Sequence, residues 1–412
     1  MRISTMQSFN TGLRSLLDNS MQVKDTQQQI STGRRVLTPA DDPVASTRIL
    51  QLQQDLSLRQ QYQKNITAAL NRQNLEDATL NGVTENVARI RELVIAAGNG
   101  ATTLEDRSYI ALEIDERLDA LVDLMNTKDA SNEYIFGGFK GDTLPIQARA
   151  GGGYEYKGDD GQRQLTISAN TKVETGDNGK DIFIDIKAAK NTFEPRANPN
   201  NTGTGVISRG LVYDQEAYDA FYPEDIIIEF NDNAAIDPAA PNFTVKQKSD
   251  GRPIESLKNM PYSTGETITV AGISIKLAGQ PNPGDSFIVD SSPKQSLTDT
   301  VQRLSEGLKS LADNPEDSAT LTNLLDDTLV NLDHAQTAVS ETRSQVGGRI
   351  NTLENIQGLH SDVTLVSQEI LSKLQDVDFA EAVSRLSLES FLLEASQQSY
   401  AKISNLSLFN QL

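Results

Sequence analysis

The sequence predicts an α+β protein, an elongated antiparallel helical bundle or coiled coil built from both chain ends with an inserted β-rich domain. Apolar residues recur in steps of three and four over both ends of the 412-residue chain, which is the spacing of coiled-coil helices. Between about residue 140 and residue 293 this period disappears, and short alternating runs replace it. Helical sequence on both sides of this insertion must therefore pack together.

These changes of pattern divide the chain into three parts. We expect residues 1–42 and 375–412 to form terminal assembly helices, and residues 43–140 and 291–374 to form a rod of long helices. Residues 141–290 then form the inserted β-rich domain.

The composition excludes several classes of protein and site. A net charge of −20 opposes binding to nucleic acid or to anionic lipid. Aromatic residues make up only 5% of the chain and Trp is absent, which suits elongated helix packing better than one globular core. Cys is absent, which excludes disulfides and Cys-based metal sites. No apolar run approaches the roughly 20 residues that span a bilayer, and the N-terminus shows no Sec-type signal.

A narrow apolar stripe marks the helix at each end of the chain. The candidate assembly residues are Met6, Phe9, Leu13, Leu16, Val23 and Ile30 at one end and Phe379, Val383, Leu386, Leu393, Tyr400 and Ile403 at the other. The other faces carry Ser, Gln and Asn rather than Lys and Glu, and uncharged polar groups cost less to bury. We expect both ends to pack against each other and against neighbouring subunits. Weakly charged helices that face water are the alternative.

The stretch STGRRVLTPADDPVASTRI, residues 31–49, contains both a stop and a start signal for helices. Gly33 suits the left-handed position just past a helix end, and Pro39 prevents smooth continuation. Asp42 is the expected N-cap of the next helix, with Pro43 at its first position. Asp41 adds favourable negative charge at that helix start. A metal role for the two aspartates is disfavoured because the cap explains them and no third ligand accompanies them.

Long helices are predicted on both sides of the insertion. The helix after Pro43 runs to Gly98-Asn99-Gly100, and a capping box at Thr102–Glu105 starts the next helix. After the insertion, the seam from Leu321 to Leu374 predicts a helix of about 80 Å. Its phase ends at residues 376–378, where we expect a bend or a break of register.

The middle of the chain has the pattern of short strands joined by turns. The predicted strands are Tyr154–Lys157, Gln164–Ser168, Asp181–Ile186, Ile226–Phe230, Phe243–Gln247, Thr267–Val270, Ile273–Leu277 and Ser286–Val289. Asp- and Gly-rich clusters separate them, as in ordinary turns. None of these clusters has EF-hand spacing, and Gly151-Gly152-Gly153 lacks the GK[ST] of a phosphate-binding loop.

Catalysis requires an acid, base, nucleophile or metal set, and the sequence offers none that is convincing. His334 and His360 both fall inside the long C-terminal helix, and neither has a nucleophile nearby at a sharp turn. His360 is better explained as a polar packing residue on the seam. We therefore predict no catalytic residue, no cofactor site and no metal site.

Four stretches resemble the bacterial flagellin superfamily. They are STGRRVLTPADDPVAS at 31–46, NEYIFGGF at 132–139, RSQVGGRINTLE at 343–354 and the closing DVDFAEAVSRLSLESFLLEASQQSYAKISNLSLFNQL. The likeness covers about the first 140 and the last 120 residues. In the insertion, GISIKLAGQPNPGDSFIV is of a type common in flagellar hook-associated proteins. Pro43 after the paired aspartates, and YIFGGF, favour the hook-associated branch of the superfamily over flagellin.

The resemblance implies a structural subunit of the bacterial flagellum at the junction of hook and filament. It implies a ring of copies that contacts the hook-proximal junction protein and flagellin, an outward-facing β-rich domain, and a cytoplasmic export chaperone. Location outside the cell, reached through type III export without a cleaved signal peptide, is also implied. The resemblance implies neither nucleic-acid binding nor insertion into a membrane.

Two other functions stay open from the residues themselves. Flagellin, the subunit of the filament, would have the same helical architecture. A generic coiled-coil scaffold or secreted adhesin that uses the β-rich domain is the third possibility. Self-assembly of the purified protein into long filaments would favour flagellin, and binding of the β-rich domain to a glycan or a host surface would favour the adhesin.

Overall fold

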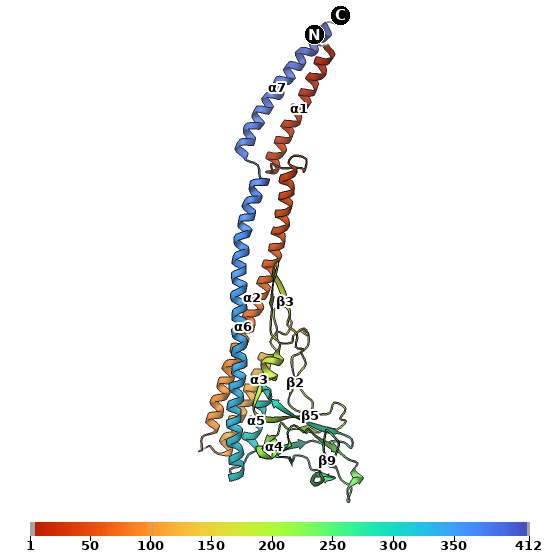
Figure 1. The fold of residues 1–412 in the computed structure, drawn as a ribbon, viewed down its shortest axis with the longest axis vertical. Helices are drawn as coiled ribbons and strands as arrows, with labels where there is room; N and C mark the ends of the chain where they lie inside the picture. Colours follow the sequence, from red (N-terminus) through yellow and green to blue (C-terminus); the bar gives the residue numbers. More distant parts are fainter. Residues whose placement is uncertain (1–4, 101, 410–412) are drawn as a thin grey trace. The chain divides into compact units, whose positions relative to one another are not determined.

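The computed structural model describes residues 5–100 and 102–409, and the chain forms two compact units (Figure 1). The first unit comprises residues 1–65 and 355–412, and the second comprises residues 66–354. None of the described helices combines the length and the apolarity that crossing a lipid bilayer requires.

Long α-helices form the parts of the chain before and after the insertion, as the apolar period predicts. They are α1 (Thr5–Thr32), α2 (Pro43–Ala97), α3 (Leu104–Met125), α5 (Leu297–Ser310), α6 (Pro315–Gln375) and α7 (Phe379–Phe409). A short helix, α4 (Gln215–Phe221), lies within the insertion. The α+β class, with helical ends and an inserted β region, is confirmed.

The insertion consists of short antiparallel strands. They are β1 (Ile146–Ala148), β2 (Tyr154–Tyr156), β3 (Gln164–Ser168), β4 (Thr171–Glu174), β5 (Lys187–Ala197), β6 (Val206–Ile207), β7 (Leu211–Val212), β8 (Ile226–Phe230), β9 (Asn242–Gln247), β10 (Met260–Pro261), β11 (Glu266–Val270), β12 (Ile273–Ala278) and β13 (Ser286–Lys294). The largest sheet has the order β10-β9-β8-β13-β5, and a second has the order β11-β12-β6, with β7 also paired to β12. The hairpins β1-β2 and β3-β4 each form a separate two-stranded sheet.

Two hydrophobic clusters organise the second unit. One joins α2, α3, α5 and α6 and also takes in Phe136, Ile146 and Phe183 from the segment after α3. The other lies within the two larger sheets, where Phe230, Phe287 and their neighbours are buried. Burying a large side chain of this kind is worth about 1.5–3 kcal/mol. The segment up to Ile186 therefore packs on the helices rather than on the sheets.

Two local predictions are wrong and one long strand was not predicted, each for an identifiable reason. The run Asp181–Ile186, predicted as a strand, lies mostly in a single π-helical turn, Lys180–Ile184, whose apolar side chains pack against the helices. The long strand β5 escaped prediction because it contains Pro195 and lacks regular alternation. The capping box of α3 is formed by Thr103 with Asp106, one residue beyond the predicted pair.

Candidate assembly surface

Helices α1 and α7 lie side by side in the first unit (Figure 1). The Asn19 Nδ2 donates a hydrogen bond to the Ser396 Oγ at 2.6 Å. A Cβ built on Gly12 would lie 3.6 Å from the Tyr400 ring. Because Gly12 lies opposite Tyr400 and Asn19 opposite Ser396, the two helices run antiparallel.

The predicted stripe residues divide into two sets in this pair. Half-buried side chains are Leu16, Val23, Ile30, Leu386, Leu393 and Tyr400. Leu13, Phe379 and Val383 are exposed. The side chains of Met6, Phe9 and Ile403 lie outside the described residues. Pairing of α1 with α7 therefore covers only part of the stripe.

A second set of large apolar residues is exposed on the same two helices. It consists of Leu17, Met21, Leu388, Phe391 and Leu392. Phe391 is 67% exposed although it is the largest apolar side chain of the set. Scattered exposed apolar residues are ordinary, but a concentration of them on one helix pair indicates a surface that another protein covers. We call the exposed residues Leu13, Leu17, Met21, Phe379, Val383, Leu388, Phe391 and Leu392 the terminal apolar face.

Sequence periodicity identified this face only in part. A period of three and four selects one stripe, whereas Leu16-Leu17 and Phe391-Leu392-Leu393 place apolar residues side by side. Such adjacent apolar residues widen the face beyond a single helix partner. They were the signal that could have identified Leu17, Phe391 and Leu392.

The break between α1 and α2 follows from its residues. Gly33 adopts φ +69°, the left-handed conformation that favours glycine after a helix end. The Asp42 Oδ1 accepts a hydrogen bond from the Ala45 backbone N–H at 2.9 Å, which is the geometry of an N-cap. Pro43 is the first residue of α2, and Pro39 lies in the turn that precedes it.

Backbone hydrogen bonds tie this break to the break between α6 and α7. The Arg35 N–H donates to the Gln375 carbonyl at 2.7 Å, and the Val377 N–H donates to the Gly33 carbonyl at 3.0 Å. The Arg35 Nη2 also donates to the Leu374 carbonyl at 2.9 Å. The helices of both chain ends are therefore interrupted at one level and joined there by an antiparallel bridge.

Asp41 makes hydrogen bonds of its own in the turn before α2. Its carboxylate accepts hydrogen bonds from the backbone N–H groups of Thr38, at 2.7 Å, and Leu37, at 3.0 Å. These bonds, that from Thr38 above all, lower the pKa of Asp41. Asp41 therefore closes the turn around Pro39, two residues before α2 begins.

Neither histidine lies in a catalytic arrangement. The His334 Nδ1 lies 2.8 Å from the Lys187 carbonyl oxygen. His360 is buried between α2 and α6, where its ring stacks on Tyr62 at 5.6 Å and its Nδ1 lies 3.3 Å from the Arg59 Nη1. Within the part of the chain that the structure describes, no three His, Cys, Asp or Glu side chains are grouped to hold a metal ion.

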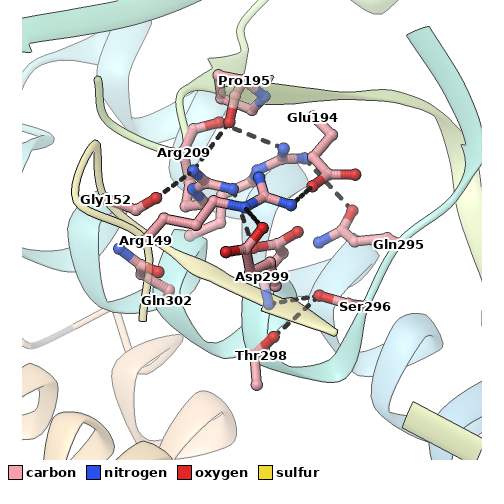
Figure 2. A network of polar contacts seen from close by, with 12 residues as sticks. Arg149, Gly152, Glu194, Pro195, Arg209, Gln295, Ser296, Thr298, Asp299 and Gln302 are labelled. Atoms are coloured by element: carbon pink, nitrogen blue, oxygen red, sulfur yellow. Dashed lines mark hydrogen bonds and ion pairs between the residues drawn. The ribbon is translucent and has the colours of Figure 1, made fainter. Parts of the chain in front are cut away.

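A buried arginine joins the insertion to α5 (Figure 2). Arg209, from the loop between β6 and β7, is completely buried, and its Nη1 donates to the Asp299 Oδ1 at 3.2 Å. Its Nη2 donates to the carbonyls of Gly152 and Pro195, both at 2.9 Å, as Figure 2 shows. A guanidinium with these partners holds three separate segments together.

A second buried polar cluster joins α2, α6 and the residues after β4. The Glu76 Oε1 accepts a hydrogen bond from the Asp177 N–H at 3.0 Å. The Arg349 guanidinium donates to both carboxylate oxygens of Asp177, at 2.7 and 3.0 Å, and to Glu174 at 2.7 Å. Burial raises the pKa of Glu76 to about 8, and the nearby Asp177 charge adds to this effect. Glu76 is therefore largely protonated at neutral pH.

The raised pKa of Glu76 makes the free energy of unfolding depend on pH, and we expect Glu76→Gln to remove this dependence. Because the pKa of Glu76 is raised in the folded chain, its contribution is complete below the unfolded pKa and is lost as pH rises through about 8. One proton changes the free energy of unfolding by about 1.4 kcal/mol per pH unit. Urea denaturation of both proteins from pH 5 to pH 9 should show the wild type losing stability faster. Parallel curves would contradict the assignment.

Comparison with known proteins connects these features to one protein family. Residues 3–140 match the family described as bacterial flagellin N-terminal helical region, and residues 329–412 match bacterial flagellin C-terminal helical region. The two matches together account for more than half of the chain. They cover α1–α3, α7 and most of α6.

Individual relatives extend the similarity through the insertion. Flagellar hook-associated protein 3 of Escherichia coli (strain K12) is 24% identical over 409 residues, 99% of each chain. The crystal structure of flagellar hook-associated protein 3 of Legionella pneumophila has 28% identity and a TM-score of 0.53, covering 79% of this chain and 98% of that one. A structure of a flagellar junction protein from the same organism has 28% identity and a TM-score of 0.50, covering 80% and 99%.

Proposed function

The chain belongs to the bacterial flagellin family, and from this premise we propose that it is a structural subunit of the hook–filament junction of the bacterial flagellum. Similarity to hook-associated protein 3 over 99% of both chains carries this proposal, because it includes the insertion as well as the family's shared helical ends. The role is structural and not enzymatic, and its place is the flagellum.

The mechanism we propose is assembly through the chain ends. Residues 1–42 and 375–412 pair with each other and pack against the same helices of neighbouring copies. The terminal apolar face supports this, because its residues are exposed in the single chain and association would remove them from water. Residues 43–140 and 291–374 form the rod, and residues 141–290 face outward.

The partners follow from this position. We propose that copies of the chain form a ring, that this ring contacts the hook-proximal junction protein on one side and flagellin on the other, and that a chaperone in the cytoplasm holds the chain before export. Export would proceed through the flagellar type III route to the outside of the cell, without a cleaved signal. An exposed apolar face explains why a chaperone would be needed.

Flagellin is the alternative function, and the observations favour it less. Its best support is the Flagellar filament 41 kDa core protein of Borreliella burgdorferi, 26% identical over only 25% of this chain. That similarity does not extend over the whole chain, whereas the similarity to hook-associated protein 3 does.

Deletion of the gene tests the proposed function. Electron microscopy of the deletion strain should show hooks without filaments, and an immunoblot of the medium should show released flagellin. Plasmid-borne wild-type protein should restore filaments and serves as the control. Flagellin absent from both cells and medium would identify this chain as the filament subunit, and unchanged flagella would reject the flagellar role.

A further inference from the structure

Three glycines lie within a short stretch of α6, at positions 347, 348 and 358. Residues 347–358 are here called the glycine segment. Glycine in a helix interior costs about 1 kcal/mol relative to alanine, because the unfolded backbone has more freedom to lose. The segment also contains Asn351, Thr352 and Asn355, which are weaker helix formers than alanine or leucine.

Packing within the described chain does not require these glycines. A Cβ built on Gly347, Gly348 or Gly358 would meet no neighbouring heavy atom of the described residues within 4 Å. Elsewhere the helical glycines do meet neighbours. A Cβ on Gly82 would approach the Leu124 Cδ2 to 3.2 Å, and one on Gly307 would overlap Leu324. Gly82 and Gly307 are therefore needed for close packing, whereas no close neighbour among the described residues requires the three glycines of the glycine segment.

The glycine segment is also weakly anchored. Leu353 is its single buried side chain among those described. The Arg349 ion pairs with Glu174 and Asp177 hold its first turn. By contrast, residues 325–339 of the same helix bury a side chain in every turn, namely Leu325, Thr328, Asn331, Leu332, Ala335 and Val339. After the segment burial stays sparse, with His360 and Ser367 the buried residues of 359–375.

We propose that the glycine segment is a built-in soft point of α6, which opens or bends locally while the helix before it, residues 325–339, stays intact. Low helix propensity and few buried contacts are the two features that give a segment a low free energy of local opening. The role of this soft point rests on the proposed function: it lets α6 change curvature as each copy fits between its neighbours in the ring.

Hydrogen exchange of the purified full-length protein tests the soft point directly. Peptides from the glycine segment should exchange faster than peptides from residues 325–339. In the double variant Gly347→Ala/Gly348→Ala, exchange of the segment should slow by about thirtyfold, since two glycine-to-alanine differences add in the opening equilibrium. The matched control Ser344→Ala/Gln345→Ala, at exposed positions one turn earlier, should leave exchange of the segment close to wild type.

The same variants separate the soft point from its use. If the glycine segment exchanges as slowly as residues 325–339, the soft point is rejected whatever the flagellar role. If the glycine-to-alanine variant slows exchange and also reduces the number of filaments per cell, both parts are supported. Slowed exchange with full filament number would reject the use in assembly, because a stiffened helix would then serve as well. The deletion strain reports on the proposed function independently of these results.

Discussion

Replacing Arg209 with Met is expected to lower the free energy of unfolding by about 3–5 kcal/mol, the cost of leaving one partner of a buried ion pair uncompensated. The Asp299 carboxylate would stay buried without its guanidinium, and the carbonyls of Gly152 and Pro195 would lose their shared donor. Urea denaturation of the full-length protein, followed by circular dichroism, measures the loss.

Two further variants make this result specific. Arg252 is paired with Asp250 at the surface, and its side chain is 78% exposed, so Arg252→Met should change stability by less than about 0.5 kcal/mol. Arg209→Met/Asp299→Leu should recover part of the loss, because it removes the unpaired carboxylate. Equal stability of wild type and Arg209→Met would show that Arg209 does not fasten the insertion to α5.

Leu17→Ser/Phe391→Ser is expected to abolish assembly while the free chain stays folded. Both side chains are exposed, so the free energy of unfolding should change by less than about 0.5 kcal/mol for each. Buried interface anchors are each worth about 2 kcal/mol or more, which is roughly a thirtyfold change in affinity. Filament counts by electron microscopy and thermal melts of the purified protein measure the two effects.

Matched variants distinguish the terminal apolar face from hydrophobic exposure in general. Leu112 on α3 is 57% exposed, and Leu112→Ser makes the same chemical change on a helix other than α1 and α7. It should leave filaments intact. Alanine at the half-buried residues Leu16, Val23, Leu386 or Leu393 should reduce assembly more than folding, because these residues border the face. Equal loss of folding and assembly in all variants would reject a dedicated assembly surface.

The sequence predicted those parts of the fold whose period is regular. The seam of α6 contains Leu325, Leu332, Val339 and Val346, and all four are buried. A heptad pattern reports a long helix reliably because every turn repeats the same requirement for burial. The strands β3 and β8 were predicted with their observed bounds, β3 because its sequence QLTIS alternates and β8 because IIIEF is a short run rich in β-branched residues.

Elements defined by distant partners could not be predicted in this way. Arg209 resembles a surface residue in the sequence, and its carboxylate partner Asp299 lies 90 residues further on. The apolar run Asp181–Ile186 looks like a strand, but it becomes a helical turn because its side chains pack on the helical core. Periodicity also cannot tell which apolar residues of α1 and α7 contact each other and which are left for another subunit.

Immunogold electron microscopy of isolated flagella tests the central claim most directly. An antibody to the insertion, residues 141–290, should label one position on each flagellum, between the hook and the start of the filament. Hooks from a strain in which a Leu17→Ser/Phe391→Ser chain replaces the native one should carry neither label nor filament. Label distributed along the whole filament would show instead that this chain is flagellin and would contradict the proposal of a junction subunit.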